Sequence, residues 1–249
     1  MDIIEAFWDQ QVTRLKTCEV LFKTGETYED YLKADVERKF QFIVVKIPVG
    51  NLKLVHKLED DGYRYLENQF CLSFKSEQID TIDLKWHRLF EGFSYKQVTT
   101  QSKIVSITEQ VSLNMFEADR YSQDPLWGKD FSSQRYVNWI NNLFLMENVK
   151  LYIMVRNEKE VGFFAVKKET DKINSCPIAG IYNHYKFAGY IFVLVWYILD
   201  ISRRMGMDRF ITSISSNNKN LLSSFSKAFN YRVDNTYIVL RKSLIRDHS

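Results

Sequence analysis

The feature that most constrains this chain is an alternation of apolar strands and helices around one short loop, between Val161 and Leu240. The loop, His184–Gly189, leads directly into Tyr190–Met205, whose length and apolar composition predict a buried helix. The N–H groups in the first turn of a helix have no partner within the helix and carry the positive end of its dipole. A strand, a loop and a helix in this order therefore predict a place to hold phosphate.

The other elements of this region are predicted from residue type and from the turn residues between them. The predicted strands are Val161–Lys167, Ile173–Tyr182, Arg209–Ser215 and Arg232–Arg241, and a second helix opens at Ser216–Asn217. Strands that alternate with helices in this way predict an α/β (α+β) fold, in which helices flank a mixed central sheet.

The N-terminal half repeats part of this order. It has a predicted strand at Phe40–Pro48, a helix at Asn51–Asp61 and a strand at Tyr63–Phe74, like the strand, helix and strand that close the C-terminal half. Both helices end on Gly or Asn, which tolerate a left-handed C-cap. An internal duplication explains the repeat, and so does a coincidence of common helix endings. On the duplication reading, the first ~95 residues are a reduced copy that covers a sheet edge or shapes the substrate cleft.

A domain boundary is predicted at the polar stretch Thr99–Lys103, between a domain at 1–98 and a domain at 103–249. The three cysteines are odd in number and far apart, which argues against both a disulfide framework and a zinc site. We expect no bound metal and a cytoplasmic protein. The 13-residue apolar run Phe187–Leu199 is shorter than the ~20 residues of a membrane span, so no membrane partner is expected.

A net charge of +3 is too small to indicate nucleic acid as a partner. Aromatic residues make up 15% of the chain. An aromatic-rich surface and open sheet edges leave a homodimer as an alternative to a monomer.

Over about Glu147 to Leu244, the chain resembles the GNAT superfamily of N-acetyltransferases in the order of its elements. The pyrophosphate signature of that family, Arg/Gln-x-x-Gly-x-Gly/Ala, falls on Lys186–Ile191, with Gly189 at the middle glycine. The first position is lysine, a point charge in place of a planar bidentate group. The last position is isoleucine, where glycine or alanine would let a ligand approach the backbone. We expect this loop to bind phosphate, but less tightly.

The N-terminal half is similar to the partial, GNAT-like N-terminal domain of the two-domain TDP-fucosamine acetyltransferases. The resemblance implies a GNAT-like sheet with a smaller GNAT-like domain before it, and acetyl-CoA as co-substrate. It also implies transfer of an acetyl group to a primary amine of a small substrate, here a nucleotide-linked amino sugar. The alternative is a catalytically silent, GNAT-like binding or assembly protein.

The resemblance also implies roles for particular residues. In the family, the strand before the signature loop parts from its neighbour and holds the thioester; Pro177 and Gly180 suit such a strand in Cys176–Ile181. The implied cofactor-binding residues are Ile178, Ala179, Gly180, Ile181, Lys186, Phe187, Ala188, Gly189, Tyr190, Ile191, Asn217 and Asn218. One of the two asparagines also suits a helix N-cap.

The acceptor side of the site is implied by a similar aromatic and basic pattern, at Arg120, Tyr121, Tyr136 and Trp139. The family often has a tyrosine on its last helix as the acid for the leaving thiolate. The matching position here is Ser226, and Tyr231 is a nearby tyrosine that could replace it. Glu117 and Asp119 could deprotonate an ammonium group, and His184 could contact phosphate, although surface carboxylates and turn histidines are commonly just solvated.

Overall fold

The computed structural model describes residues 1–77, 88–186 and 189–244. Within these residues one sheet contains eleven strands, in the order β1-β2-β3-β11-β4-β10-β8-β7-β6-β5, with β9 paired to β7 beside this path. The strands are β1 (Asp2–Glu5), β2 (Thr17–Leu21), β3 (Phe42–Pro48), β4 (Arg64–Lys75), β5 (Phe93–Gln97), β6 (Val149–Arg156), β7 (Lys159–Lys168), β8 (Ile173–Ser175), β9 (Ala179–Ile181), β10 (Arg209–Ser215) and β11 (Arg232–Ser243).

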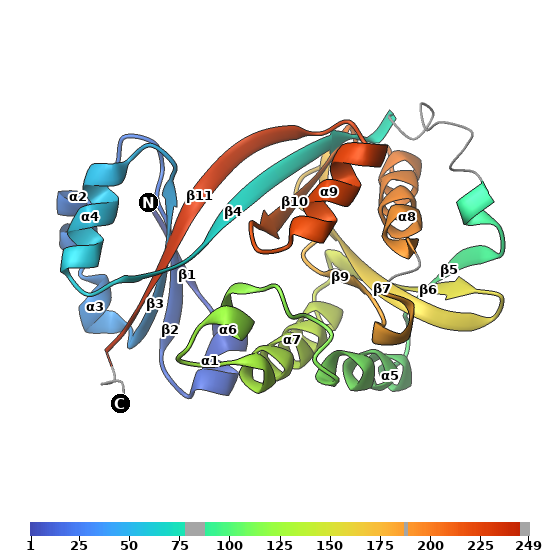
Figure 1. The fold of residues 1–249 in the computed structure, drawn as a ribbon, viewed down its shortest axis with the longest axis horizontal. Helices are drawn as coiled ribbons and strands as arrows, with labels where there is room; N and C mark the ends of the chain where they lie inside the picture. The colour runs from blue at the N-terminus through green and yellow to red at the C-terminus, as the bar shows by residue number, and fades with distance from the viewer. Residues whose placement is uncertain (78–87, 187–188, 245–249) are drawn as a thin grey trace.

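Among the described residues, four helices belong to the N-terminal half of the chain and five to the C-terminal half (Figure 1). The N-terminal group is α1 (Phe7–Thr13), α2 (Tyr28–Lys33), α3 (Val36–Lys39) and α4 (Leu52–Asp60). The C-terminal group is α5 (Gln101–Ser112), α6 (Arg120–Gln123), α7 (Lys129–Phe144), α8 (Tyr190–Arg204) and α9 (Lys219–Ala228), with a 3-10 turn at Asn183–Tyr185. In space, α1 lies beside α7, apart from α2, α3 and α4 (Figure 1).

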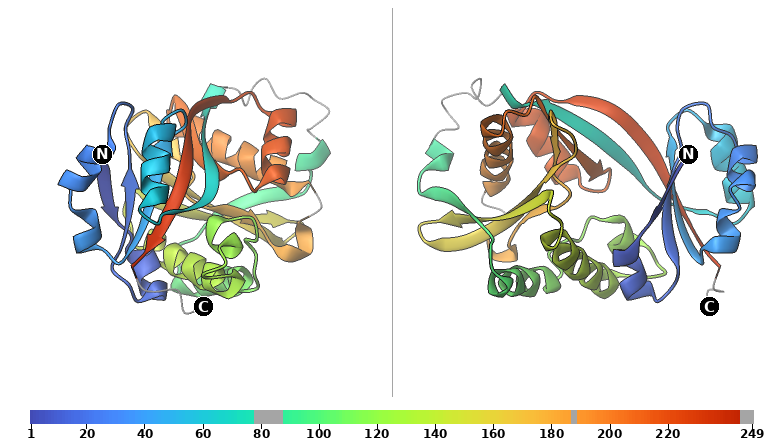
Figure 2. Two further views of the ribbon diagram at one scale, coloured as in Figure 1. Left: turned by 60° about the vertical axis from the view of Figure 1, so that its left-hand side comes forward. Right: turned by 180° about the vertical axis from the view of Figure 1, so that it is seen from behind.

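Two long strands, β4 and β11, connect the halves (Figures 1 and 2). Strand β11 lies between β3 and β4, and β4 lies between β11 and β10. The two strand–helix–strand repeats are β3-α4-β4 and β10-α9-β11, and the closing strand of each is thus inserted between the two strands of the other. The exchange makes a single continuous sheet, and it buries apolar side chains of both halves along shared strands.

Alternating side chains of β7 supply two cores on opposite faces of the C-terminal part of the sheet. Phe164 and Val166 pack with α8 and α9, whereas Phe163 and Ala165 pack with α5 and α7. Helices α8 and α9 therefore cover one face, and α5 and α7 cover the other. A third core, which includes Tyr63, lies between the sheet and helices α2, α3 and α4.

Most predicted elements are confirmed with small changes at their ends. One is wrong: the single strand predicted at Ile173–Tyr182 is two strands, β8 and β9, separated at Pro177. Proline has no N–H to donate to a ladder, so pairing stops there. The second predicted helix begins at Lys219, two residues later than predicted, because Asn218 is its N-cap.

The predicted division at 98–103 lies within one continuous sheet. Strand β5, on the N-terminal side of the division, pairs along its whole length with β6 on the other side. The division into domains 1–98 and 103–249 stays a prediction. Among the described helices, none has the length and apolar character that crossing a bilayer requires.

Candidate functional site

The site is built around the point where two neighbouring strands separate. Strand β8 pairs in parallel with β10 up to Ser175 and Ile211, and the N–H of Cys176 still donates to the carbonyl of Ile211 at 3.0 Å. After Pro177, the described pairing of β9 is with β7 alone. The predicted parting of this strand from its neighbour is therefore confirmed.

The parting exposes backbone groups along one edge of β9. The carbonyl of Ile178 and the N–H of Tyr182 bond to β7, and Gly180 pairs directly with Phe163. Since backbone groups of alternate residues in a strand point in opposite directions, those of Ala179 and Ile181 point away from β7, toward β10. This edge can accept an extended, amide-containing chain as a further strand would be accepted.

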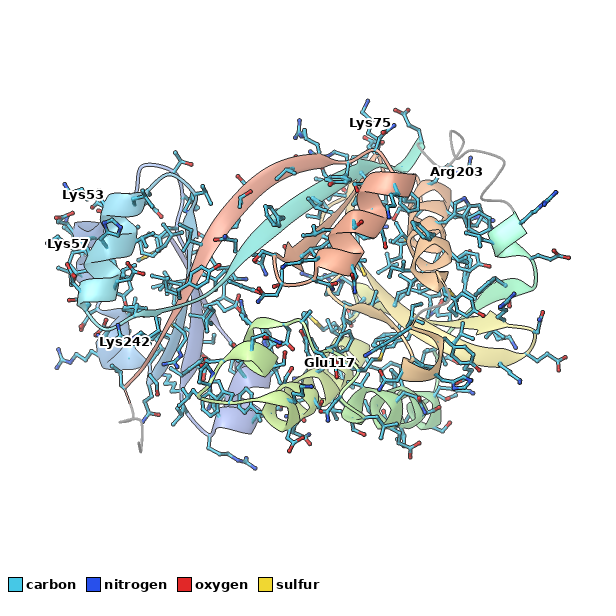
Figure 3. The ribbon with its side chains drawn as sticks, viewed as in Figure 1. Lys53, Lys57, Lys75, Glu117, Arg203 and Lys242 are labelled. Atoms are coloured by element: carbon cyan, nitrogen blue, oxygen red, sulfur yellow. The ribbon has the colours of Figure 1, made fainter. Side chains whose placement is uncertain are left out.

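Gly180 allows the loop between α5 and α6 to pack closely on β9. A Cβ at this position would overlap the terminal methyl group of Met115 and would lie 3.2 Å from the ring of Phe116. The loop also carries Glu117, which is exposed (Figure 3). The α5–α6 loop is therefore next to the parted strands, on the face covered by α5 and α7.

The predicted phosphate loop follows β9 and ends at the first turn of α8. Gly189 has φ of 71°, a left-handed conformation that glycine adopts without steric cost, and it is the N-cap of α8. Lys186 is exposed at the start of the loop, and Tyr190 and Ile191 are half-buried at the start of the helix. Phe187 and Ala188 lie outside the described residues.

The two asparagines follow β10, the other parted strand. The side-chain oxygen of Asn218 accepts the N–H of Leu221 at 3.2 Å and caps α9. Asn217 is exposed, and its own N–H donates to the Ser215 hydroxyl at 3.1 Å. One asparagine therefore has the predicted capping role, and the other presents its side chain to solvent.

The two candidate acids differ in their contacts. The exposed hydroxyl of Ser226 donates to the carbonyl of Ser223 in its own helix, at 3.0 Å. The Tyr231 ring lies 5.9 Å from that of Phe74, which pairs with Phe210 at the start of β10. Because β10 still pairs with β8 there, Tyr231 lies at the closed end of the parting.

Three of the four predicted acceptor residues pack against the N-terminal half. The Arg120 guanidinium is paired with the Glu19 carboxylate, and the hydroxyl of fully buried Tyr121 donates to Asp9 at 2.6 Å. The ring of Trp139 stacks on that of Trp8, with centroids 6.1 Å apart. The polar atoms of Arg120 and Tyr121 thus bond to protein groups. Their predicted role in binding an acceptor stays a prediction.

Tyr136 approaches the parted strands more closely. Its ring lies 4.3 Å from that of Phe116, which in turn contacts Gly180. Of the four predicted acceptor residues, Tyr136 therefore lies near the parted strands, separated from Gly180 by the ring of Phe116.

A buried group of charges lies between the halves. Burial alone would raise the pKa of the Glu19 carboxyl, but the charges of Arg120 and Lys46 lower that pKa well below its usual range. Lys46 lies 2.7 Å from this carboxylate. Arg135 likewise forms an ion pair with Asp9, so each of these cations has an acidic partner from the N-terminal half.

Sequence reasoning missed Glu67, which lies on β4 and is 3% exposed. Burial raises the pKa of its carboxyl, and among the described residues no hydrogen-bond partner is found for its Oε2 atom. The alternation of Glu67 and Gln69 in a predicted strand puts both on one face. Their proximity to β10 becomes visible only once β4 is known to pair with it.

Sequence reasoning also missed a pocket of about 220 Å³ beside the phosphate loop. Its lining residues are Arg156, Asn157, Lys159, Val161, His184, Tyr185 and Tyr190. The signal in the sequence was a pair of cations, Arg156 and Lys159, that flank a two-residue turn. In the described parts of the chain, no group of His, Cys, Asp and Glu side chains is arranged to hold a metal ion.

No protein-family model and no curated protein sequence matches this chain. Solved structures do match it. A GCN5-related N-acetyltransferase from Sphaerobacter thermophilus has a TM-score of 0.65 at 13% identity, over 98% of this chain and 76% of that one. A conserved protein of unknown function from Staphylococcus epidermidis has a TM-score of 0.64 at 13% identity, over 92% and 84%.

A tandem GNAT protein from the clavulanic acid biosynthesis pathway matches with a TM-score of 0.56 at 11% identity, over 93% of this chain and 76% of that one. Likenesses at this level of identity concern the fold. The predicted GNAT-like sheet flanked by helices is confirmed, and the chain has the fold of the GCN5-related N-acetyltransferases.

Proposed function

We propose that this protein transfers an acetyl group from acetyl-CoA to the primary amine of a small molecule. The observation that carries the proposal is the parting of β9 from β10 directly before a loop that caps α8 with a left-handed glycine. Such a parting offers an extended amide chain a backbone edge, and the helix offers a diphosphate its first-turn N–H groups.

The described residues fit the two ends of this co-substrate. The outward N–H and C=O groups of Ala179 and Ile181 would pair with the amides of the pantetheine arm. The exposed ammonium group of Lys186 and the first turn of α8 would hold the diphosphate. The exposed side chain of Asn217 stands at the end of β10, where it could donate to the same arm.

In the reaction, the nitrogen of a neutral amine attacks the thioester carbon, the C–N bond forms, and the C–S bond breaks. The protein contributes by holding the two reactants together and by polarising the thioester carbonyl with backbone N–H groups of β9. The nitrogen, which is positively charged after the attack, loses one proton, and the leaving thiolate takes one. Ser226 and Tyr231 stay candidates for the donor to the thiolate, and the Ser226 hydroxyl would have to leave its bond to the Ser223 carbonyl.

For the acceptor, we propose a nucleotide-linked amino sugar. This rests on the resemblance of the N-terminal half to two-domain amino-sugar acetyltransferases. The acceptor would approach from the face of α5 and α7, where Tyr136, Phe116 and Glu117 lie near β9. An amine with a pKa of roughly 8 has a useful neutral fraction at pH 7, so a dedicated base is not required.

The test is an assay of thiol release from acetyl-CoA in the presence of a panel of amines. The panel contains nucleotide-linked amino sugars, free amino sugars and a lysine peptide. We expect release to depend on one of the sugar amines and to be stoichiometric with acetylated product. Release with the peptide alone would contradict the acceptor class, and absence of release with every amine would contradict the transfer.

A second candidate function is a catalytically silent protein that binds acetyl-CoA or assembles with a partner. Two observations favour it: isoleucine at position 191, the last position of the predicted pyrophosphate signature, and the Ser226 hydroxyl bonded within its own helix. Binding of acetyl-CoA without turnover of any amine in the panel would support this candidate over the enzyme.

A further inference from the structure

The pocket beside the phosphate loop is lined by two cationic side chains, Arg156 and Lys159, and aromatic rings hold the first of them in place. The Arg156 guanidinium lies over the rings of Phe93 and Tyr190, at 5.3 and 5.1 Å from their centroids, and one of its N–H groups donates to the Tyr190 hydroxyl. Contact with these two rings and the bond to the Tyr190 hydroxyl restrict the position of the guanidinium and leave most of its five N–H donors for a further partner.

The turn next to Arg156 is itself well defined. Asn157 and Glu158 have φ of 46° and 67°, as in a two-residue type I′ hairpin turn. The N–H of Asn157 donates to the carbonyl of Gly92 at 2.9 Å, which ties the turn to the segment before β5. The hairpin therefore holds its flanking residues in fixed positions.

Arg156 and Lys159 are paired directly across this hairpin, so their side chains share one face. Two like charges opposite each other destabilise a pair of strands. Both side chains are exposed, and in the described parts of the chain no carboxylate forms an ion pair with either. His184 also lines the pocket. A bound anion would attract both cationic side chains and so offset the repulsion between them.

We propose that Arg156, Lys159 and His184 form a site for a phosphomonoester, separate from the diphosphate site at the first turn of α8. Arginine suits this ligand because its planar fork can make two parallel hydrogen bonds to phosphate oxygens. The aromatic walls, Tyr185 and Tyr190, stack with centroids 5.9 Å apart and offer a flat apolar surface beside the phosphate.

The ligand could be the 3′-phosphate of coenzyme A or a separate phosphorylated small molecule. The first source rests on the proposed function, because the pocket shares Tyr190 with the start of α8 and lies within the same loop region. In that case the site adds affinity that Lys186 and Ile191 do not supply.

The experiment compares coenzyme A, dephospho-coenzyme A and inorganic phosphate by calorimetry and thermal shift. It uses the wild type and the double variant Arg156→Gln/Lys159→Gln. We expect the wild type to bind coenzyme A about tenfold more tightly than dephospho-coenzyme A, since charged hydrogen bonds of this kind are lost with the phosphate. The double variant should lose this preference and keep its affinity for dephospho-coenzyme A.

The control is Lys96→Gln/Lys150→Gln, which removes the same charge from exposed positions on β5 and β6 outside the pocket. It should keep the preference for coenzyme A.

The other outcomes distinguish the two sources of the ligand. If the wild type shows no preference for coenzyme A over dephospho-coenzyme A, but inorganic phosphate stabilises the wild type and not the double variant, the ligand is a separate phosphomonoester. If neither coenzyme binds while phosphate still does, the proposed function fails and the pocket stands. Equal behaviour of wild type and double variant toward all three ligands would overturn the inference.

Discussion

At the scale of single residues, two glycines at the ends of α8 provide a matched pair. Gly189 before the helix and Gly206 after it both have φ of 71°. Valine at either position costs about 1–2 kcal/mol of backbone strain. We expect Gly189→Val to weaken acetyl-CoA binding at least tenfold while the protein stays folded, because the loop can no longer present its N–H groups in the same direction.

The matched control is Gly206→Val, which carries the same strain at the far end of the helix. It should lose a similar amount of stability and keep its affinity for acetyl-CoA. Calorimetric titration and thermal unfolding of both variants measure the two effects separately. Equal affinity in the two variants would show that the loop does not bind the co-substrate.

A second residue-scale prediction concerns Glu19, whose carboxylate is paired with Arg120 and Lys46. Removing one partner of a buried pair leaves an uncompensated charge, so Glu19→Gln should lower the free energy of unfolding at pH 7 by about 3–5 kcal/mol. Glu117→Gln, at an exposed pair with Lys129, should lower it by less than about 1 kcal/mol.

The same carboxyl predicts a pH dependence. Its pKa is lower in the folded protein than the unfolded value of about 4.3, so the unfolded state binds more protons as the pH falls. The stabilisation is present above that unfolded value and is lost as the pH drops below about 5 toward the folded pKa. Urea denaturation from pH 7 to pH 3 should therefore show a steeper loss of stability in wild type than in Glu19→Gln. Parallel curves would contradict the pairing.

The contacts of Arg120 and Tyr121 could not be predicted from their residue types. Basic and aromatic residues near one another indicated an acceptor site, but their partners, Glu19 and Asp9, lie more than a hundred positions earlier in the chain. Residue types do not reveal such partners, because any acidic side chain in the chain is an equally suitable one.

At the scale of elements, the two halves differ in one respect that bears on function. Strands β2 and β3 pair in parallel from Thr17 to Leu21, and the N–H of Phe22 continues the pairing with the carbonyl of Lys46. Strands β8 and β10 instead pair over three residues, after which β9 parts from β10. The described N-terminal half therefore lacks the parted edge that would hold a pantetheine arm.

This difference predicts one acetyl-CoA per chain. Native mass spectrometry at saturating acetyl-CoA should show a single bound molecule, since β2 and β3 use their backbone groups on each other. Two bound molecules per chain would mean that the N-terminal half opens to make a second site.

Elements were predictable where local chemistry decides them. Pro177 and Gly180 pointed to a strand that parts from its neighbour, because proline interrupts a ladder and glycine often marks a bulge. The break of that strand into β8 and β9 was not predicted, since the apolar residues on either side of Pro177 continue a single pattern.

At the scale of the whole molecule, the exchange of β4 and β11 joins the two halves through their sheets. Each half would lose a central strand without the other. We expect one cooperative unfolding transition, with coincident curves by circular dichroism and tryptophan fluorescence. Separately produced segments 1–98 and 103–249 should each fail to show such a transition. A folded, stable 103–249 segment would support independent domains instead.

The sequence showed the repeated strand, helix and strand in the two halves, which is the basis of this exchange. It did not show the exchange itself. The closing strand of each repeat, β4 or β11, has an apolar pattern that suits either neighbour, and only the packing of the complete sheet selects between pairing within a repeat and pairing across the two repeats. The position of Glu67 near β10 follows from that selection.

On the proposed function, the parted strands and the loop at Gly189 bind acetyl-CoA. The most direct measurement is calorimetric titration of the purified protein with acetyl-CoA. We expect micromolar binding at one molecule per chain, weakened in Gly189→Val and retained in Gly206→Val. Absence of detectable binding at millimolar acetyl-CoA would contradict it.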